Sequence, residues 1–415
     1  MKIAVIGGGV SGLTAAWLLS RQHDVQLYER EARLGGHAHT HAVRVGSGVV
    51  PVDTGFMVFN QRTYPTFVAM LAALGVESRA SDMSFSVRCD RCDVAYSSVG
   101  LRGLFAHPRR AFTTAHLAML AEILRFFRAG RRALGDGSAA LMTLGDFLDA
   151  HRFGAAVVGH FVLPMGGAIW SASGGAMRAF SATSYLRFLD NHGLLAVTGQ
   201  PVWRTVVGGS GRYVERIAET LGDGVHVGLP VRRVTRTASG VTLELDGEPP
   251  QSADAVVIAT HADEALALLG DPSPEESAAL GAFGYSRNPT VLHSDATYLP
   301  GRPAARASWN VRLRDCRAEH EPVEITYDLT RLQGLGAAEP MLCTLNDHGA
   351  PAQVHARMDY SHPILDQQAV VGQQRIAALN GARHTYYCGA HLGYGFHEDG
   401  ARSAVTVAAR LGVPL

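Results

Sequence analysis

The sequence predicts an α/β protein organised around a parallel sheet, and features near its start carry this prediction. Residues 3–6 are consecutive apolar residues, as in a strand that is buried on both faces. Glycines follow at the spacing Gly7-x-Gly9-x-x-Gly12, and an apolar helix runs on from them. A second strand then ends at Glu29. This order of strand, glycines, helix, strand and acid predicts a Rossmann-like dinucleotide site.

The glycine turn has the composition that a bound pyrophosphate requires. Gly7 permits the tight turn, Gly9 lets backbone N–H groups approach the phosphates, and Gly12 lets helix and strand pack closely. Val10 and Ser11 lie between the last two glycines, in front of a helix whose N-terminus presents about half a positive charge. The alternative is a glycine-rich turn that binds nothing, which the order of the flanking elements disfavours.

Charged side chains after the second strand select among nucleotides. Glu29 can accept hydrogen bonds from an adenosine ribose, and a 2′-phosphate would lie close to its carboxylate, which disfavours NADP. Arg30 and Arg33 weaken that argument. The paired glycines after Arg33 offer a second close backbone approach, and an arginine suits a phosphate. We therefore add to the predicted site the residues Arg30, Arg33, Gly35, Gly36 and His37.

A dinucleotide as long as FAD needs a further run of close-approach residues downstream. Asp53, Thr54 and Gly55 are the candidates for the flavin end of such a ligand, although an ordinary turn before a strand explains Asp53 equally well. Residues 208–211 form another glycine-rich turn. They could make a third phosphate nest, but a connection between a strand and a helix is the favoured interpretation.

Hydrophobic periodicity predicts the elements that follow. It predicts a helix over 63–74, a strand over 83–87 and a return to strands over 225–257. Residues 253–261 have the composition of a buried parallel strand that ends in a small-residue turn. Apolar residues around Pro164 are expected to form a wall beside a ligand, although core packing explains them as well.

The C-terminal segment repeats the opening pattern of strand, glycine-rich loop and helix. A strand ends near Gly389, and the following helix contains Gly400 and Ala401. The N-terminus of that helix is expected to face the flavin edge where negative charge develops when N5 accepts a hydride. Glu398 and Asp399 would oppose that charge, so we expect them to cap the helix and point away, leaving backbone N–H groups at the flavin.

Length and composition bound the class of protein. The chain has 415 residues, of which 47% are apolar, enough for two domains or for one domain with a large insertion. A formal net charge of zero and a pI near 7.3 disfavour nucleic acid as a partner. Five cysteines form no even disulfide framework, which indicates a reducing compartment. No apolar run reaches the roughly 18 residues of a membrane span, so we expect a cytoplasmic protein.

The pair Cys89 and Cys92 has the CxxC spacing of a metal ligand pair. Because no second pair and no histidines at matching spacing accompany it, the sequence does not predict a zinc site or any other metal site. Two cysteines near the tip of a hairpin are the favoured interpretation.

A long amphipathic helix is predicted after residue 107, and it has two interpretations. It could lie on an anionic membrane surface as a peripheral contact. It could instead pack on its own domain, with arginines near its C-terminal dipole. Its predicted apolar face is Leu117, Leu120, Leu124 and Phe127, and its basic residues are Arg125, Arg128, Arg131 and Arg132.

Together, the glycine motif, Glu29, the Arg33-x-Gly35-Gly36 segment, the strand that ends at Thr260 and the C-terminal loop resemble the FAD-dependent amine oxidase and phytoene desaturase superfamily. A closer resemblance is to a bacterial flavoprotein group similar to the FAD-binding N-terminal region of plant cyclopropane fatty acid synthases. That closer resemblance rests on residues 53–60, 82–86, 169–171 and 393–400.

The resemblance implies noncovalent FAD in a discontinuous, glutathione-reductase-like fold of two domains, with mixed sheet and helices in the substrate domain. It also implies fatty acyl or phospholipid substrates, and backbone contacts from Val231 toward the adenine. The expected FAD-binding domain comprises residues 1–60, 202–265 and 376–415, and the expected substrate-binding domain comprises residues 61–201 and 266–375.

One departure from the amine oxidases bears on activity. Those enzymes commonly place a lysine near flavin N5, but Lys2 is the only lysine here and belongs to the first strand. We therefore expect an FAD-dependent oxidoreductase that oxidises, desaturates or isomerises a fatty acyl substrate, with His362, His391 or His397 handling protons. The alternatives are a flavin amine oxidase and a flavin-bearing accessory protein whose partner is a lipid methyltransferase.

Overall fold

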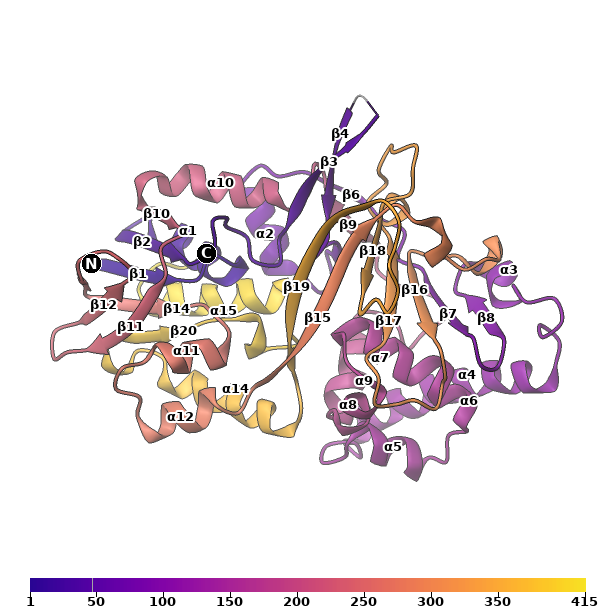
Figure 1. Cartoon of the computed structure of the whole chain (residues 1–415). Helices are drawn as coiled ribbons and strands as arrows, with labels where there is room; N and C mark the ends of the chain where they lie inside the picture. Colours follow the sequence, from indigo (N-terminus) through magenta and orange to yellow (C-terminus); the bar gives the residue numbers. More distant parts are fainter. Residues whose placement is uncertain (47) are drawn as a thin grey trace.

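The computed structural model describes residues 1–46 and 48–415, and it places the N-terminal strand at the centre of a five-stranded sheet. The strand order is β10-β2-β1-β14-β20, and each neighbouring pair is parallel (Figure 1). The predicted parallel strands within 3–6 and 253–261 are confirmed. The strands are β1 (Lys2–Ile6), β2 (Asp24–Glu29), β10 (Val225–Val227), β14 (Ala255–Ile258) and β20 (Thr385–Tyr387).

Helices cover this sheet on both faces, which explains why β1 is apolar at successive positions. Ile3 and Val5 belong to one core cluster with residues of α1 and α15. Ala4 and Ile6 belong to a second cluster with residues of α11, α12 and α14. Successive side chains of a strand point to opposite faces, so both faces must be buried. These helices are α1 (Val10–Leu19), α11 (Ala262–Leu268), α12 (Pro274–Leu280), α14 (Gln367–Leu379) and α15 (His397–Arg410).

A second sheet has seven strands in the order β19-β15-β18-β17-β16-β7-β8. Its pairs are antiparallel except β16 with β7, which run parallel. The predicted strand over 83–87 begins two residues later, at Phe85. The strands are β7 (Phe85–Cys89), β8 (Val94–Ser97), β15 (Gly284–His293), β16 (Trp309–Leu313), β17 (Glu324–Asp328), β18 (Leu342–Leu345) and β19 (Val354–Ile364).

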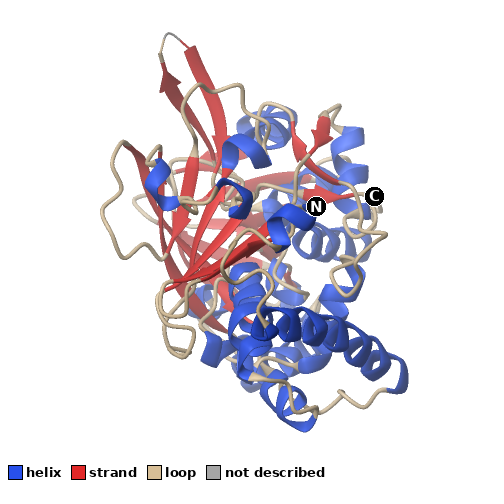
Figure 2. Ribbon diagram, turned by 90° about the vertical axis from the view of Figure 1, so that its right-hand side faces the viewer, coloured by secondary structure: helices blue, strands red, loops and turns tan. Residues whose placement is uncertain are grey.

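A layer of helices packs beside this second sheet and lies at the bottom of the view in Figure 2. It includes a π-helical turn over Val158–Val162, which continues directly into α7. The helices are α3 (Gly100–Leu104), α4 (Thr114–Asp136), α5 (Leu144–Ala150), α6 (Ala155–Val157), α7 (Leu163–Trp170), α8 (Gly174–Ala179) and α9 (Ala182–Asn191).

The predicted apolar face of α4 is confirmed only in part. Leu120 and Phe127 are partly buried against the core, whereas Leu117 and Leu124 are 45% and 40% exposed, respectively. The face that packs into the core is the adjacent one, whose residues each precede a predicted residue by about one position. Both faces carry apolar side chains, and packing against the neighbouring helices selects between them. The buried residues are His116, Met119, Ile123, Phe126, Gly130 and Ala133.

Smaller elements complete the described chain. The predicted helix over 63–74 is α2 (Pro65–Ala73), which begins at the proline because proline suits the first helical turn. Among the described residues, no helix combines the length and the apolar character that crossing a membrane requires. The remaining elements are β3 (Thr40–Val45), β4 (Gly48–Asp53), β5 (Phe59–Asn60), β6 (Ser78–Ala80), β9 (Trp203–Val206), α10 (Gly211–Leu221), β11 (Val231–Arg236), β12 (Val241–Leu245), β13 (Gln251–Ala253) and α13 (Leu329–Leu332).

Candidate active site

The first glycine turn is held by contacts that only glycine permits. Gly7 has φ +104°, and a Cβ on Gly12 would lie 1.8 Å from the carbonyl oxygen of Gly7. A Cβ on Gly9, by contrast, would have no atom of the described residues within 4 Å. Gly7 and Gly12 are therefore required by the fold itself. The space in front of Gly9 is open for backbone N–H groups to meet a ligand.

Two further glycine segments pack against this turn. The N–H of Gly35 donates to the carbonyl oxygen of Gly8 at 2.8 Å. A Cβ on Gly36 would lie 3.2 Å from Cα of Gly9, and a Cβ on Gly55 would lie 2.3 Å from the carbonyl oxygen of His37. The structure thus brings three separately predicted segments into one contiguous surface.

Glu29 and the arginines nearby have definite partners. The Glu29 carboxylate accepts hydrogen bonds from the N–H groups of Gly8 at 2.6 Å and Glu31 at 2.8 Å. A carboxylate offers about four lone-pair sites, so a ribose hydroxyl can still donate to it. Arg33 donates to the carbonyl oxygens of its own loop, and Arg30 pairs with Glu264 at the surface at 2.8 Å. The arginines therefore stabilise the loops around the turn in this structure.

The N-termini of α1 and α15 pack directly against each other. A Cβ on Gly400 would lie 2.7 Å from Ser11 Oγ and 2.8 Å from Val10 Cγ1. At α1 the N-cap residue is Gly9, which offers no side-chain acceptor, and the first turn contains no acidic residue. The N–H groups of that turn are therefore available to an anion, and the helix dipole favours one.

Both carboxylates at the start of α15 are bound to protein. Glu398 accepts hydrogen bonds from the N–H groups of Thr66 at 3.1 Å and Phe67 at 3.0 Å, and so caps α2. Asp399 accepts from the N–H groups of Tyr394 at 2.9 Å and Phe396 at 3.2 Å. Burial raises the pKa of Asp399 to about 6. Glu398 thus caps a different helix from the expected one.

Asp53 is the centre of a buried network. Its carboxylate accepts hydrogen bonds from the hydroxyl of Thr40, and from the N–H and hydroxyl of Ser210 at 2.8 to 2.9 Å. Burial raises its pKa to about 6 in spite of these bonds. The Gly211 N–H donates to the Thr40 hydroxyl at 2.8 Å. Side chains thus occupy the N–H groups of Ser210 and Gly211, as expected of a connection between a strand and a helix.

Four buried imidazole nitrogens lack a hydrogen-bond partner among the described residues, and two of them belong to segments of the predicted site. These two are His37 Nε2 and His391 Nε2. Burial lowers the pKa of both imidazoles, that of His391 to about 3. A buried polar atom without a partner costs free energy, so each nitrogen fits a hydrogen-bonding group of a bound ligand.

Comparison with known proteins decides the family. Residues 10–292 match the family model described as flavin containing amine oxidoreductase. That match covers more than half of the chain. The chain belongs to the flavin-containing amine oxidoreductase family. It is an FAD-dependent oxidoreductase.

The names of similar proteins indicate several different substrates. The chain is 30% identical over 298 residues to a coproporphyrinogen III oxidase of Mycobacterium leprae (strain TN), covering 66% of this chain and 63% of that protein. Its fold is similar to that of a CLA-producing fatty acid isomerase from P. acnes, with TM-score 0.70, 14% identity and 98% of each chain covered. It is also similar to a redesigned putrescine oxidase, with TM-score 0.71, 16% identity and coverage of 99% and 98%.

Several residues predicted for the cofactor have the chemistry that FAD requires. The open face at Gly9, the uncapped N-terminus of α1, and the unpartnered nitrogens of His37 and His391 all belong to segments predicted for the cofactor. A pyrophosphate suits the first two features. Hydrogen-bonding groups of the ligand suit the two nitrogens.

The other predicted cofactor residues make contacts within the same segments. Leu229, two residues before Val231, donates its N–H to the carbonyl oxygen of Glu29 at 3.1 Å, which holds the start of β11 near the ribose acid. Thr260 follows β14, with Cγ2 at 3.3 Å from a Cβ on Gly7. Gly389 donates its N–H to the Ser403 hydroxyl at 3.0 Å. Thr54 bonds the Tyr360 hydroxyl, and Ala401 is buried in α15.

The structure places the three candidate proton-handling histidines in different surroundings. His397 stacks on Phe56 with ring centroids 3.6 Å apart, and its Nε2 lies 3.2 Å from the Tyr213 hydroxyl. His362 Nδ1 lies 3.0 Å from the Asn288 amide nitrogen, which donates to it. Burial lowers the pKa of His362 to about 4 and that of His397 to about 3. Each imidazole is therefore neutral near pH 7 and can accept a proton only weakly.

The sequence reasoning missed several side chains of this site. Tyr360 on β19 lies with its hydroxyl 2.7 Å from Thr54 Oγ1 and 3.1 Å from His39 Nδ1. Gln333 exchanges two hydrogen bonds with the backbone of Asp53, at 3.0 and 2.8 Å. These residues belong to strands and turns without a motif of their own. The long pairing of β15 with β19 could have placed Tyr360 here, but it does not include Gln333, which follows α13.

Proposed function

We propose that this oxidoreductase oxidises, desaturates or isomerises a fatty acyl or lipid substrate. FAD, when bound, supplies the hydride acceptor. The observation that carries the proposal is a cleft beside the start of α15 with an aromatic wall. Aromatic side chains in such a cleft can pack against an acyl chain, while the polar lining residues can bind its polar end. The aromatic lining residues are Tyr64, Phe188, His192, Tyr394 and Phe396.

Charged groups in the same cleft fit an acyl chain with an anionic end. Arg62 and Arg402 line it. Arg62 donates to the carbonyl oxygens of residues 191 and 199 and retains further N–H donors for a carboxylate or phosphate. Of the carboxylates in the lining, Glu398 and Asp399 already accept backbone N–H groups. Asp190 also lines the cleft, and Arg402 pairs with Asp399 at 2.6 Å, so Arg62 is the lining cation that we assign to an anionic end.

The position of the single lysine also favours an acyl substrate over an amine. Lys2 belongs to β1, where its backbone N–H donates to Asp254 at 2.7 Å. The chain therefore has no second lysine to place near flavin N5, as amine oxidases commonly do. The similarity to a CLA-producing fatty acid isomerase agrees with an acyl substrate, and so does the resemblance to the flavoprotein group related to plant cyclopropane fatty acid synthases.

The proposed chain organisation is the glutathione-reductase-like one expected above, with the Rossmann-like domain discontinuous in sequence. Within it, His37 and His391 would hold polar groups of the flavin, and His362, behind them, would fix the orientation of its neighbour His37. The rings of His37 and His362 are 5.2 Å apart. This arrangement is a proposal that flavin content in His37→Phe and His362→Phe variants would test.

An anaerobic substrate panel tests the function. Unsaturated fatty acids and extracted phospholipids should bleach the flavin absorbance, or should emerge with a moved double bond when analysed by mass spectrometry. Arg62→Ala should raise the KM for a fatty acid about tenfold, as loss of one charge-assisted contact predicts. Arg216→Ala, an exposed arginine on α10, should not. Bleaching by amines alone would overturn the proposal in favour of amine oxidation.

A second candidate substrate follows from the curated relative. Because the chain is 30% identical to a coproporphyrinogen III oxidase, a porphyrinogen belongs in the same panel. Its conversion, with inert lipids and amines, would identify a tetrapyrrole oxidase. A flavin that no substrate reduces, together with stable copurification of a lipid methyltransferase, would instead identify an accessory protein.

We further propose that α4 and the segment before it contact an anionic lipid surface. Phe112 is 79% exposed, and Leu117 and Leu124 are also exposed on the side of α4 that does not enter the core. Exposed arginines, including Arg128 and Arg131, accompany these apolar residues. Such a combination suits the interface of a membrane that contains acidic lipids. Cosedimentation with phosphatidylglycerol vesicles but not phosphatidylcholine vesicles, weakened in Phe112→Ser, would support the contact, and equal recovery with both would exclude it.

A further inference from the structure

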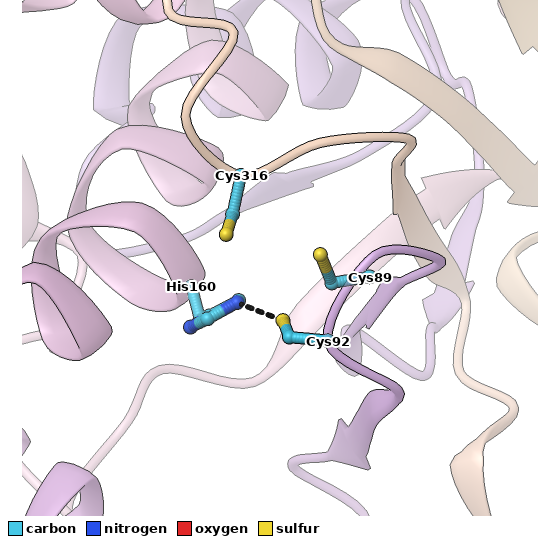
Figure 3. Close-up of side chains that lie close together, drawn as sticks. All are labelled: Cys89, Cys92, His160 and Cys316. Carbon is cyan, nitrogen blue, oxygen red and sulfur yellow. Dashed lines mark hydrogen bonds between the residues drawn. The ribbon is translucent and has the colours of Figure 1, made fainter.

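Four potential metal ligands converge outside the flavin site (Figure 3). They are Cys89, Cys92, His160 and Cys316, and their ligand atoms all lie within 4.8 Å of one another. His160 Nε2 is 3.0 Å from Cys92 Sγ. Figure 3 shows the three sulfur atoms and the imidazole directed toward a common centre.

Strand pairing brings the three cysteines together. Cys89 ends β7, and the predicted hairpin tip, the turn between β7 and β8, holds Cys92. The parallel partner of β7 is β16, and the pairing continues past both strands. Asp90 donates its N–H to the carbonyl oxygen of Leu313 at 2.8 Å, and Arg91 donates to that of Arg314 at 3.1 Å. Two residues beyond Arg314, Cys316 therefore reaches the hairpin tip.

The imidazole belongs to the helical layer, and its hydrogen bonds define which of its ring nitrogens carries the hydrogen. His160 belongs to the π-helical turn, and π-helical turns are frequent at functional sites. Its Nδ1 lies 3.1 Å from the carbonyl oxygen of Ala156. A carbonyl only accepts, so Nδ1 carries the hydrogen and the lone pair of Nε2 faces the thiols. This outer hydrogen bond is the one that metal-binding histidines normally make.

Gly159 allows the last ligand to approach. A Cβ at this position would lie 3.0 Å from the carbonyl oxygen of Cys316, so a larger residue would push the loop after β16 away. The neighbouring His160 is fixed from the other side, because the Tyr96 hydroxyl donates to its carbonyl oxygen at 2.8 Å. The loop that carries Cys316 and the helical turn that carries His160 can therefore approach each other closely.

We propose that Cys89, Cys92, His160 and Cys316 bind one Zn²⁺ ion as a structural site. Three thiolates and one imidazole are a known ligand set of tetrahedral structural zinc, and this soft, carboxylate-free set does not suit Mg²⁺ or Ca²⁺. Four protein ligands leave no open position, so the ion would not be catalytic. Binding displaces the three thiol protons to solvent. The site would join the hairpin, the loop after β16 and the helical layer.

The sequence argument against a zinc site considered only ligands that lie close together in the sequence. It required a second cysteine pair or histidines at matching spacing, whereas the fold supplies one histidine and one cysteine from distant elements. His160 lies 68 residues after Cys92. No spacing rule connects residues at such a separation.

Metal analysis of the FAD-loaded, full-length protein tests the proposal. We expect about one zinc per chain by inductively coupled plasma mass spectrometry, and a loss of several-fold in Cys92→Ser and in Cys316→Ser. Cys343→Ala, a cysteine on β18 outside the cluster, should keep its zinc. Removal of the metal with a chelator should lower the Tm of the wild type but not that of Cys92→Ser.

Cobalt substitution keeps the test valid if a cysteine variant folds poorly. Wild-type protein that has been stripped of metal and supplied with Co²⁺ should show the visible absorption of tetrahedral thiolate coordination. Equal zinc content in the wild type and both serine variants would overturn the proposal. So would an intact mass showing a Cys89–Cys92 disulfide in freshly purified protein, or iron in place of zinc. None of these outcomes depends on the substrate of the flavin.

Discussion

Mild acid should destabilise this protein because several imidazoles are buried in their neutral form, and three of them are the candidate proton-handling histidines. Burial lowers the pKa of His362 to about 4, and those of His391 and His397 to about 3. In the unfolded chain each would titrate near its ordinary pKa of about 6.5. Between those values the unfolded state binds protons that the folded state does not. Their stabilising contribution is therefore present above about pH 6.5 and is lost as the pH falls.

The size of the effect follows from the same pKa values. Each histidine loses about 1.4 kcal/mol per pH unit, so three lose about 6 kcal/mol between pH 6.5 and 5. Asp53 and Asp399 oppose this loss, since burial raises the pKa of each to about 6. A raised carboxyl pKa returns stability as the pH falls below it, here about 3 kcal/mol for the pair by pH 5. The expected net loss from these five groups is about 3 kcal/mol, a large share of a typical stability of about 5–15 kcal/mol. His37, His192 and His293, whose pKa values burial also lowers, change stability in the same direction.

Urea unfolding followed by tryptophan fluorescence, at pH 6.5 and pH 5 with a fixed excess of FAD, measures this difference. His397→Gln should reduce the pH dependence by about 2 kcal/mol, because it removes one of the three groups. His348→Gln, an exposed imidazole, should leave it unchanged. An equal or greater free energy of unfolding at pH 5 would refute the reasoning.

Two other substitutions test the packing. Gly12→Ala would place its Cβ 1.8 Å from a carbonyl oxygen of the turn, so the variant should purify with little flavin, whereas Gly135→Ala has open space and should keep its flavin and gain about 0.5–1 kcal/mol. Flavin-to-protein absorbance ratios check this. Arg236→Met removes the buried partner that lies 2.7 Å from Glu276 and should cost about 3–5 kcal/mol in urea unfolding. Arg232→Met, at a fully exposed ion pair, should change nothing measurable.

The parts of the fold that the sequence predicted depend on short-range constraints. The turn at Gly7 and Gly12 is dictated by backbone contacts within six residues, so glycine spacing alone locates it. The apolar run of β1 and the small-residue end of β14 record burial on both sheet faces. Such signals can be recognised from a short segment of the sequence alone.

The parts that it missed depend on partners chosen by tertiary packing. Leu117 and Phe126 both lie on α4 and both are apolar, but only contact with neighbouring helices decides that Phe126 is buried. Glu398 was expected to cap its own helix, yet it caps α2, whose N–H groups lie 332 and 331 residues away in sequence. Helical propensity and periodicity carry no information about such pairings.

The strand order of the second sheet separates the two sites that we propose. Tyr360 and His362 lie on β19, at one edge of the sheet, and contact Thr54 and His37 of the segments that we propose to bind the flavin. Cys89 lies on β7, which is next to the opposite edge. A metal at Cys89 would therefore act on the flavin only through the intervening strands. Its removal should lower stability while leaving the flavin spectrum unchanged, and a spectral change on chelation would require a path that this strand order does not provide.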